Sequence, residues 1–208
     1  TGVQTCALPI LFFMELKDSR TKENLLRAFA GESQARNRYE FAAEVAKREG
    51  WQIIHDLFKY TADQEKAHAR VYYDALKQFN GENININAAY PIGDYPDTLS
   101  LLRDSQHNER EEWSNIYSDF AEIAKNEGFE PISKLFSMVA SVEKEHDDRF
   151  TKYINELENG TIYKRDQPIK WMCTNCGYIY EGKEPPLICP VCSYPQGYYM
   201  DFTMTQYE

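Results

Sequence analysis

The sequence predicts a mainly α protein in which a four-helix bundle is followed by a small domain built on two cysteine knuckles. Three observations lead to this prediction. Residues 21–158 place apolar side chains at helical spacing with few interruptions. Residues 170–208 are instead rich in aromatic residues and proline and have no helical period. Four of the five cysteines lie there in two C-x-x-C pairs, a spacing typical of metal knuckles and not of a disulfide framework.

The composition is that of a soluble globular protein and excludes several classes of partner. The chain has 208 residues, enough for one good-sized domain and a small one, with 42% hydrophobic and 27% charged residues. A net charge of −10 argues against nucleic acid and anionic membranes as partners, because either needs a basic face. No apolar run reaches the ~18 residues of a membrane span. Thiols at metal spacing and the lack of a convincing leader favour the cytoplasm.

Residues 1–13 are expected to be a non-native or disordered tail. A short apolar stretch lies in this segment, but no basic residue precedes it and no convincing cleavage site follows. Met14 is a natural start that leads directly into the first helix. A degenerate secretory leader is the alternative interpretation.

Glycine and proline divide the helical region. Gly50 and Gly128 each interrupt the apolar periodicity, and Pro131 suits the first turn of a helix. Helices are expected over residues 21–49, 52–79, 98–126 and 131–157.

The connections predict a ferritin-like bundle. Residues 81–96, between the second and third helices, are rich in Asn, Gly and Pro. In ferritin-like folds two helical hairpins with short turns are joined by one long crossover. We therefore expect the bundle over residues 14–158, a polar linker over 159–169 and the knuckle domain over 170–208.

The two helical pairs resemble each other in sequence. The motif AKREGW at residues 46–51 recurs as AKNEGF at residues 124–129, an offset of 78. The same offset relates Tyr39 to Tyr117, Glu65 to Glu143 and His68 to His146. Glu32 instead falls on Arg110, one residue after Glu109. A one-residue insertion in the third helix, such as a π-bulge, restores the match.

Two Glu-x-x-His motifs predict a metal site. Glu65 with His68, and Glu143 with His146, are each three residues apart, so each pair shares one helix face. Carboxylate with imidazole suits iron or manganese better than a thiolate-preferring ion.

The other two helices supply further carboxylates. Glu32 lies in the first helix, and Glu109 and Glu112 lie three residues apart in the third. The Glu32–Glu65 separation of 33 nearly equals the Glu109–Glu143 separation of 34, which places the ligands of all four helices at one depth. A lone Glu-x-x-His usually marks a solvated face, but two copies with matched glutamates indicate a dinuclear centre.

The remaining polar residues of the bundle are given ordinary roles. His55 and His107 lack partners at ligand spacing and are expected at the surface or in packing. Glu111 and Glu145 are expected to point away from the metal. Tyr39 and Tyr117 are expected in the core, where they could hydrogen-bond to ligands.

The cysteines predict a second metal site. Two C-x-x-C turns can close a tetrahedral site of four thiolates, which indicates zinc or iron. The cysteines are Cys173, Cys176, Cys189 and Cys192. A structural zinc ribbon is the alternative. Tyr178, Tyr180 and Pro190 flank the knuckles as in a rubredoxin and favour iron.

Taken together, the chain from Met14 onward resembles the rubrerythrins. The matching segments, in order along the chain, are AGESQARNRYEF, TADQEKAHA, EREEW, SVEKEHDDRF, CTNCGYIYEG and LICPVC. The departures are the N-terminal tail and a longer crossover, and neither touches a ligand.

The resemblance implies a ligand set and an activity. Seven residues would bind two irons: Glu32, Glu65, His68, Glu109, Glu112, Glu143 and His146. Glu65 and Glu143 would bridge the irons, and Glu112 would exchange with His68 on reduction, so these four are the expected catalytic residues. The implied reaction reduces hydrogen peroxide to water, in defence against oxidative stress in anaerobic or microaerobic cells.

The resemblance also implies partners. Electrons would come from reduced rubredoxin or an NAD(P)H-dependent reductase and pass through the four-cysteine iron, within a homodimer. Three other hypotheses remain open: a ferroxidase or iron-storage protein, a binding module with a structural zinc ribbon, and an oxygen-using di-iron oxidase.

Overall fold

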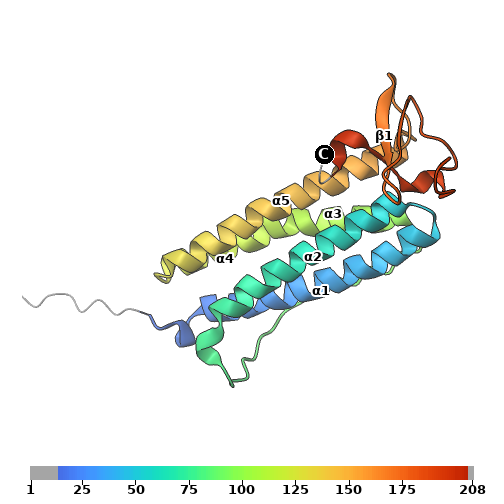
Figure 1. Cartoon of the computed structure of the whole chain (residues 1–208). Helices are drawn as coiled ribbons and strands as arrows, with labels where there is room; N and C mark the ends of the chain where they lie inside the picture. Colours follow the sequence, from blue (N-terminus) through green and yellow to red (C-terminus); the bar gives the residue numbers. More distant parts are fainter. Residues whose placement is uncertain (1–13, 206–208) are drawn as a thin grey trace, which may run out of the picture.

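A computed structural model describes residues 14–205. The predicted tail, and the last three residues of the predicted knuckle domain, lie outside the described residues. Long helices run side by side along one axis, and a small sheet domain packs at one end of them (Figure 1). Of the described helices, none is long and apolar enough to cross a membrane.

The four predicted helices are confirmed, with two refinements. The first refinement is that the second helix stops before residue 79, at Ala75, and a 3-10 turn (Lys77–Phe79) follows it. The other is that the third helical run contains a π-helical turn, η3, which confirms the insertion predicted from the repeat. The elements of the bundle are α1 (Arg20–Arg48), α2 (Gln52–Ala75), α3 (Thr98–Glu111), η3 (Glu112–Ile116), α4 (Tyr117–Asn126) and α5 (Glu130–Glu158).

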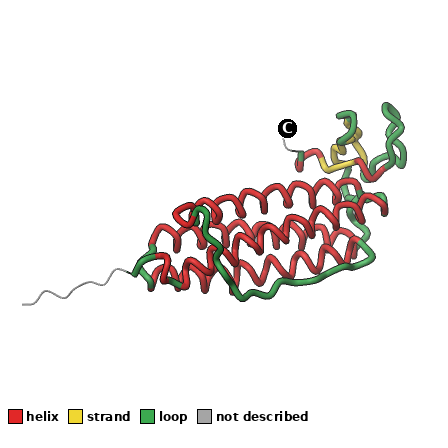
Figure 2. Tube along the Cα trace, turned by 90° about the horizontal axis from the view of Figure 1, so that it is seen from below, coloured by secondary structure: helices red, strands yellow, loops and turns green. Residues whose placement is uncertain are grey.

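Glycine turns make the two hairpins. Gly50 joins α1 to α2 and Gly128 joins α4 to α5, with φ of 85° and 89°. A side chain at either position would be strained by this left-handed backbone. Between the hairpins, the crossover runs along the length of the bundle (Figure 2). The fold is therefore ferritin-like.

Each hairpin caps the first helix of the other. The Glu127 carboxylate, at the end of α4, accepts hydrogen bonds from the backbone N–H groups of Arg20 and Thr21 at 3.0 and 2.9 Å. Glu49, at the corresponding place after α1, accepts one from the Thr98 N–H at 3.0 Å. Carboxylates at helix N-termini satisfy free N–H groups and complement the helix dipole. The internal repeat is thus expressed as pseudo-twofold contacts.

Two hydrophobic clusters fill the bundle, with a polar layer between them. The first includes Tyr39, Phe58 and Phe150, towards the sheet domain. The second includes Tyr72 and Phe136, towards the other end. Fully buried aromatic rings lie in both clusters. Their arrangement excludes water from the carboxylates between them.

The C-terminal domain is a three-stranded antiparallel sheet with strand order β2-β1-β3. Its strands are β1 (Ile169–Cys173), β2 (Ile179–Gly182) and β3 (Tyr199–Asp201). It contacts the bundle at the α1–α2 turn, and there the linker residue Tyr163 stacks on Trp51 with the ring centroids 6.0 Å apart. At the same contact, a Cβ added to Gly197 would lie 2.0 Å from the Gly50 carbonyl oxygen, so only glycine fits there.

Candidate metal centres

The polar layer of the bundle contains two overlapping groups of potential metal ligands. Within each group the ligand atoms lie within 4.8 Å of one another. The first group is Glu32, Glu65, His68 and Glu143, and the second is Glu65, Glu109, Glu143 and His146. Glu65 and Glu143 belong to both groups, as expected of bridging carboxylates.

The geometry is nearly symmetric. His68 Nδ1 lies 2.8 Å from Glu143 Oε1 and 3.2 Å from Glu65 Oε2. His146 Nδ1 lies 2.8 Å from Glu143 Oε2 and 3.0 Å from Glu65 Oε1. The i, i+3 spacing on α2 and α5 directs each glutamate and its histidine to one side of the helix. Each imidazole thus faces one oxygen of both shared carboxylates.

These carboxylates are held where an isolated charge is costly. Glu32, Glu65, Glu109 and Glu143 are each at most 1% exposed. Burial, followed by repulsion from Glu143, raises the pKa of Glu32 well above its ordinary value. Burial, followed by repulsion from Glu65, raises the pKa of Glu109 to about 8. The buried carboxylates of this layer therefore favour the binding of protons or metal cations.

The buried ligand atoms fit metal ions. Several make no hydrogen bond of acceptable geometry within the described part of the chain, despite the short contacts described above, although nearly all buried polar groups normally make one. They are Glu32 Oε2, Glu65 Oε1, Glu109 Oε2, both carboxylate oxygens of Glu143, and His146 Nδ1. Coordination would satisfy all of them, and their carboxylate and imidazole chemistry suits iron.

Two tyrosines hold the outer carboxylates, as the sequence indicated. The Tyr39 hydroxyl donates to Glu109, and the Tyr117 hydroxyl donates to Glu32. Each bond joins one hairpin to the other. Such bonds fix the free oxygen of a ligand and so orient the other oxygen towards the metal.

Glu112 stands apart from the six residues that the structure brings together. It begins η3, is half-buried and belongs to neither ligand group. Burial and repulsion from Glu109, Glu143 and Glu65 raise its pKa well above the ordinary value. Its carboxylate also borders a cavity of 320 Å³ that the helices and the crossover enclose. Glu112 is therefore the site carboxylate placed next to open space.

Sequence reasoning missed the residues that orient His146. Its Nε2 lies 3.1 Å from Gln64 Oε1, which also accepts a hydrogen bond from Arg149 at 2.9 Å. Because Gln64 Oε1 accepts, Nε2 holds the proton and Nδ1 is free for a metal. The internal repeat gave no signal, because the residue 78 positions after Gln64 is Val142.

Asp147 is the second residue that sequence reasoning missed. It accepts hydrogen bonds from Trp113 Nε1 at 3.0 Å and from Arg110 Nε at 3.1 Å, and also from Gln106. These donors lie on both sides of Glu112. Asp147 thus fastens the π-helical turn to α5, beside His146.

The four cysteines of the sheet domain come together as predicted. The Sγ atoms of Cys173 and Cys192, and those of Cys176 and Cys189, are 3.7 Å apart. Metal–sulfur bonds of about 2.3 Å in a tetrahedron give sulfur–sulfur edges of about 3.8 Å. All four thiols are free. The arrangement fits one tetrahedral metal ion.

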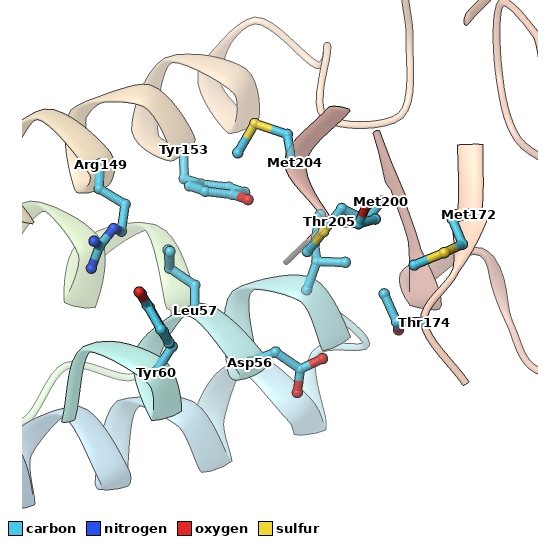
Figure 3. A pocket seen from close by; sticks show the side chains of 11 residues that line it. Asp56, Leu57, Tyr60, Arg149, Tyr153, Met172, Thr174, Met200, Met204 and Thr205 are labelled. Carbon is cyan, nitrogen blue, oxygen red and sulfur yellow. The ribbon is translucent and has the colours of Figure 1, made fainter. Parts of the chain in front are cut away.

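A cavity of 560 Å³ lies between the bundle and the sheet domain (Figure 3). Arg149, Tyr60 and Tyr153 line its bundle side. On the sheet side Thr174 lines it, directly after Cys173. Arg149 in turn bonds to Gln64, so the cavity lies between the two ligand sets.

The residues expected to have ordinary roles lie away from both ligand sets. His55 pairs with Gln52 and Asp56 at the start of α2. His107, Glu111 and Glu145 are exposed.

Comparison with known proteins places these sites in a family. The family model described as Rubrerythrin matches residues 23–154 and 100–173, and the rubredoxin-like domain of rubrerythrin matches residues 171–200. The chain is 44% identical to rubrerythrin of Clostridium perfringens, over 91% of this chain and 98% of that protein. It is 43% identical to rubrerythrin of Porphyromonas gingivalis, over 88% of this chain and 90% of that protein.

A solved structure of nigerythrin in a mixed-valence state has a similar fold. It has a TM-score of 0.59 and 25% identity, covering 97% of this chain and all of that one. Nigerythrin has also been solved in a fully reduced, all-ferrous state. The bundle and the sheet domain thus have the ligand sets of a di-iron centre and of a four-cysteine iron centre.

Proposed function

This chain belongs to the rubrerythrin family, and we propose that it is a peroxidase that reduces hydrogen peroxide to water with electrons passed through its four-cysteine iron. Iron-dependent oxidoreduction follows from the family. The observation that carries the finer proposal is the presence, in one chain, of two ligand groups sharing Glu65 and Glu143 and a separate four-thiolate site.

The proposed ligands follow the geometry. Glu32 and His68 would hold one iron, Glu109 and His146 would hold the other, and Glu65 with Glu143 would be shared by both. Glu112 would be the alternative to His68 at the first iron. Its place at η3, beside the carboxylates but outside both groups, supports a ligand that binds in one oxidation state and withdraws in the other.

The reaction needs two electrons and two protons for each peroxide, and it gives two molecules of water. When bound, two adjacent ferrous ions supply both electrons together, which avoids release of a hydroxyl radical. The chain's own residues prepare this chemistry. Tyr39, Tyr117 and Gln64 orient the ligands, while the hydrophobic clusters on either side exclude bulk water.

The four-cysteine centre is proposed as an electron relay. Iron held by four thiolates exchanges single electrons, and Cys176 is exposed at the surface, where a donor can approach. Reduced rubredoxin or an NAD(P)H-dependent reductase is the proposed electron donor. The free thiols suit a reducing cytoplasm. A homodimer and a role in oxidative-stress defence complete the proposal.

Substitution of the shared carboxylates tests the di-iron assignment. Glu65→Ala or Glu143→Ala should abolish peroxide turnover, because each removes a ligand from both irons. Glu145→Ala, an exposed neighbour on α5, is the matched control and should keep the wild-type rate. Full activity in the first two variants would refute the assignment.

The relay is tested separately. Cys189→Ser should stop turnover supported by a rubredoxin-type donor, while the helical circular dichroism of the bundle stays unchanged. Chemically pre-reduced di-iron protein should still react once with peroxide. An unchanged donor-supported rate would rule out the relay.

A further inference from the structure

The cavity beside Glu112 is lined by residues of several elements. They come from α1, from the third helical run (α3, η3 and α4), and from the crossover. The bridging carboxylates are at most 1% exposed, and core clusters close both ends of the bundle. Glu112 therefore connects the buried ligand layer with a space of 320 Å³.

Residues 87–91 of the crossover, here called the strap, are joined to one residue of α1, Arg27, by two hydrogen bonds of opposite direction. The Tyr90 hydroxyl donates to the Arg27 carbonyl oxygen at 2.8 Å. Arg27 Nε donates in return to the Asn87 carbonyl oxygen at 3.0 Å. This reciprocal pair holds the strap in one position over the cavity.

The Tyr90 ring rests against helix backbone. A Cβ added to Gly31, the residue before Glu32, would lie 3.7 Å from Tyr90 Cε1. This is an ordinary van der Waals distance, so the ring lies directly over α1 next to a metal-site glutamate. Tyr90 lines the cavity and is 37% exposed, so its ring separates the cavity from solvent.

A second anchor lies just beyond the strap. A Cβ on Gly93 would be 2.6 Å from the Asp104 carboxylate, which shows how closely the crossover packs on α3. Asp104 also accepts a hydrogen bond from Asn108, a residue that lines the cavity. The crossover is thus bonded to α1 through the strap and packs closely on α3 just after it.

We propose that this cavity is the route by which peroxide reaches the di-iron centre, and that Tyr90 limits the size of the hydroperoxides that enter. The inference rests on the proposed peroxidase function. Hydrogen peroxide is close in size to water, which takes about 30 Å³, and passes readily. A bulky hydroperoxide such as cumene hydroperoxide meets the fixed Tyr90 ring and is disfavoured.

The first test measures selectivity. Reoxidation of the ferrous protein is followed by stopped flow with hydrogen peroxide and with cumene hydroperoxide. In Tyr90→Ala the rate for cumene hydroperoxide relative to hydrogen peroxide should rise about tenfold, the scale of a pocket that loses a steric wall. Tyr90→Phe keeps the ring and should keep the wild-type ratio. Tyr95→Ala removes an exposed crossover tyrosine outside the cavity lining and should also keep it.

The second test does not depend on peroxide. Binding of phenol, an iron ligand bulkier than hydrogen peroxide, to the oxidised protein is followed by the absorption band of the phenolate–iron complex. Phenol should associate several-fold faster with Tyr90→Ala than with the wild type or Tyr95→Ala. Equal phenol rates, or an unchanged hydroperoxide ratio, in Tyr90→Ala would overturn the access route. A wild type that binds phenol in this Tyr90-dependent way but ignores peroxide would overturn the proposed function instead.

Discussion

Tyr39 and Tyr117 each combine two tasks. Their rings belong to different hydrophobic clusters, while their hydroxyls donate to Glu109 and Glu32 in the polar layer between those clusters. Each tyrosine thereby packs in a hydrophobic cluster with its ring and orients a carboxylate with its hydroxyl. Because each bond crosses from one hairpin to the other, the position of a ligand depends on how the hairpins pack together.

Removing one of these hydroxyls should weaken metal binding with little effect on packing. Tyr117→Phe leaves the ring but deprives Glu32 of its donor. We expect the affinity of the carboxylate site for iron to fall about 10- to 100-fold, as is typical when an outer hydrogen bond to a ligand is lost. Competition with a chelator measures this.

The matched control is Tyr153→Phe. Tyr153 is also buried, but its hydroxyl makes no hydrogen bond to the described residues. Its loss should leave iron affinity at the wild-type value. Equal affinities in Tyr117→Phe and the wild type would show that the hydroxyl does not position Glu32.

At the scale of elements, the π-helical turn breaks the symmetry of the bundle. Before η3 the two halves align with an offset of 77, as for Glu32 and Glu109, and after it with an offset of 78, as for Tyr39 and Tyr117. Both the glutamate and the tyrosine of the third helical run can therefore face the site. The turn also begins with Glu112, for which α1 has the buried Ala35 at the equivalent position.

Deleting Ser114, an exposed residue of η3, should convert the turn to regular α-helix. The residues on either side would then rotate relative to each other by about 100°. We expect helical circular dichroism to persist and the carboxylate iron to be lost, while the four-cysteine iron remains as an internal reference. Ser114→Ala keeps the length and should bind both. Retention of the di-iron centre in the deletion variant would contradict this role of η3.

The cap at the start of α1 gives a pH-dependent prediction. Burial alone would raise the pKa of Glu127, but the hydrogen bonds from Thr21 and Arg20 outweigh it and lower the pKa below its ordinary value. A group with a lowered folded-state pKa stabilises the fold above its unfolded pKa of about 4.3. That contribution is lost as the pH falls through the folded-state pKa.

Glu127→Gln should therefore lower the free energy of unfolding by about 1 kcal/mol at neutral pH. The difference from the wild type should disappear as the pH falls through the lowered folded-state pKa of Glu127, because the carboxyl group is then protonated in the folded and the unfolded state. Denaturant unfolding at a series of pH values checks this. Glu122→Gln, at an exposed position of the same helix, should show no such difference. A difference that persists at low pH would contradict the cap.

The sequence could predict most elements because their signals are local. Gly50 and Gly128 set the turns. The two Glu-x-x-His motifs predicted the metal site of the bundle, and the one-residue mismatch between Glu32 and Glu109 in the repeat predicted the π-turn. The end of α2 at Ala75 was not predicted, because apolar Phe79 continues the pattern while its backbone forms a 3-10 turn. Gln64 and Asp147 were missed because their roles depend on contacts between helices that spacing along the chain does not encode.

At the scale of the whole molecule, the fold places a costly charged layer inside a hydrophobic bundle. Ionised carboxylates in an apolar interior are tolerated when cations compensate them. Iron is therefore expected to stabilise the bundle as well as to react. The sheet domain, fastened where Gly197 meets Gly50, adds a second iron centre to the same chain. The proposed electron delivery and peroxide reduction would thereby be united in one molecule.

The most direct test of the account is metal analysis of the anaerobically purified protein, with its visible spectrum recorded before and after peroxide is added to the reduced form. Two ligand groups and one four-cysteine site predict about three irons per chain, a red thiolate–iron spectrum and rapid reoxidation by peroxide. Zinc in the cysteine site, with no colour and no response to peroxide, would contradict the account.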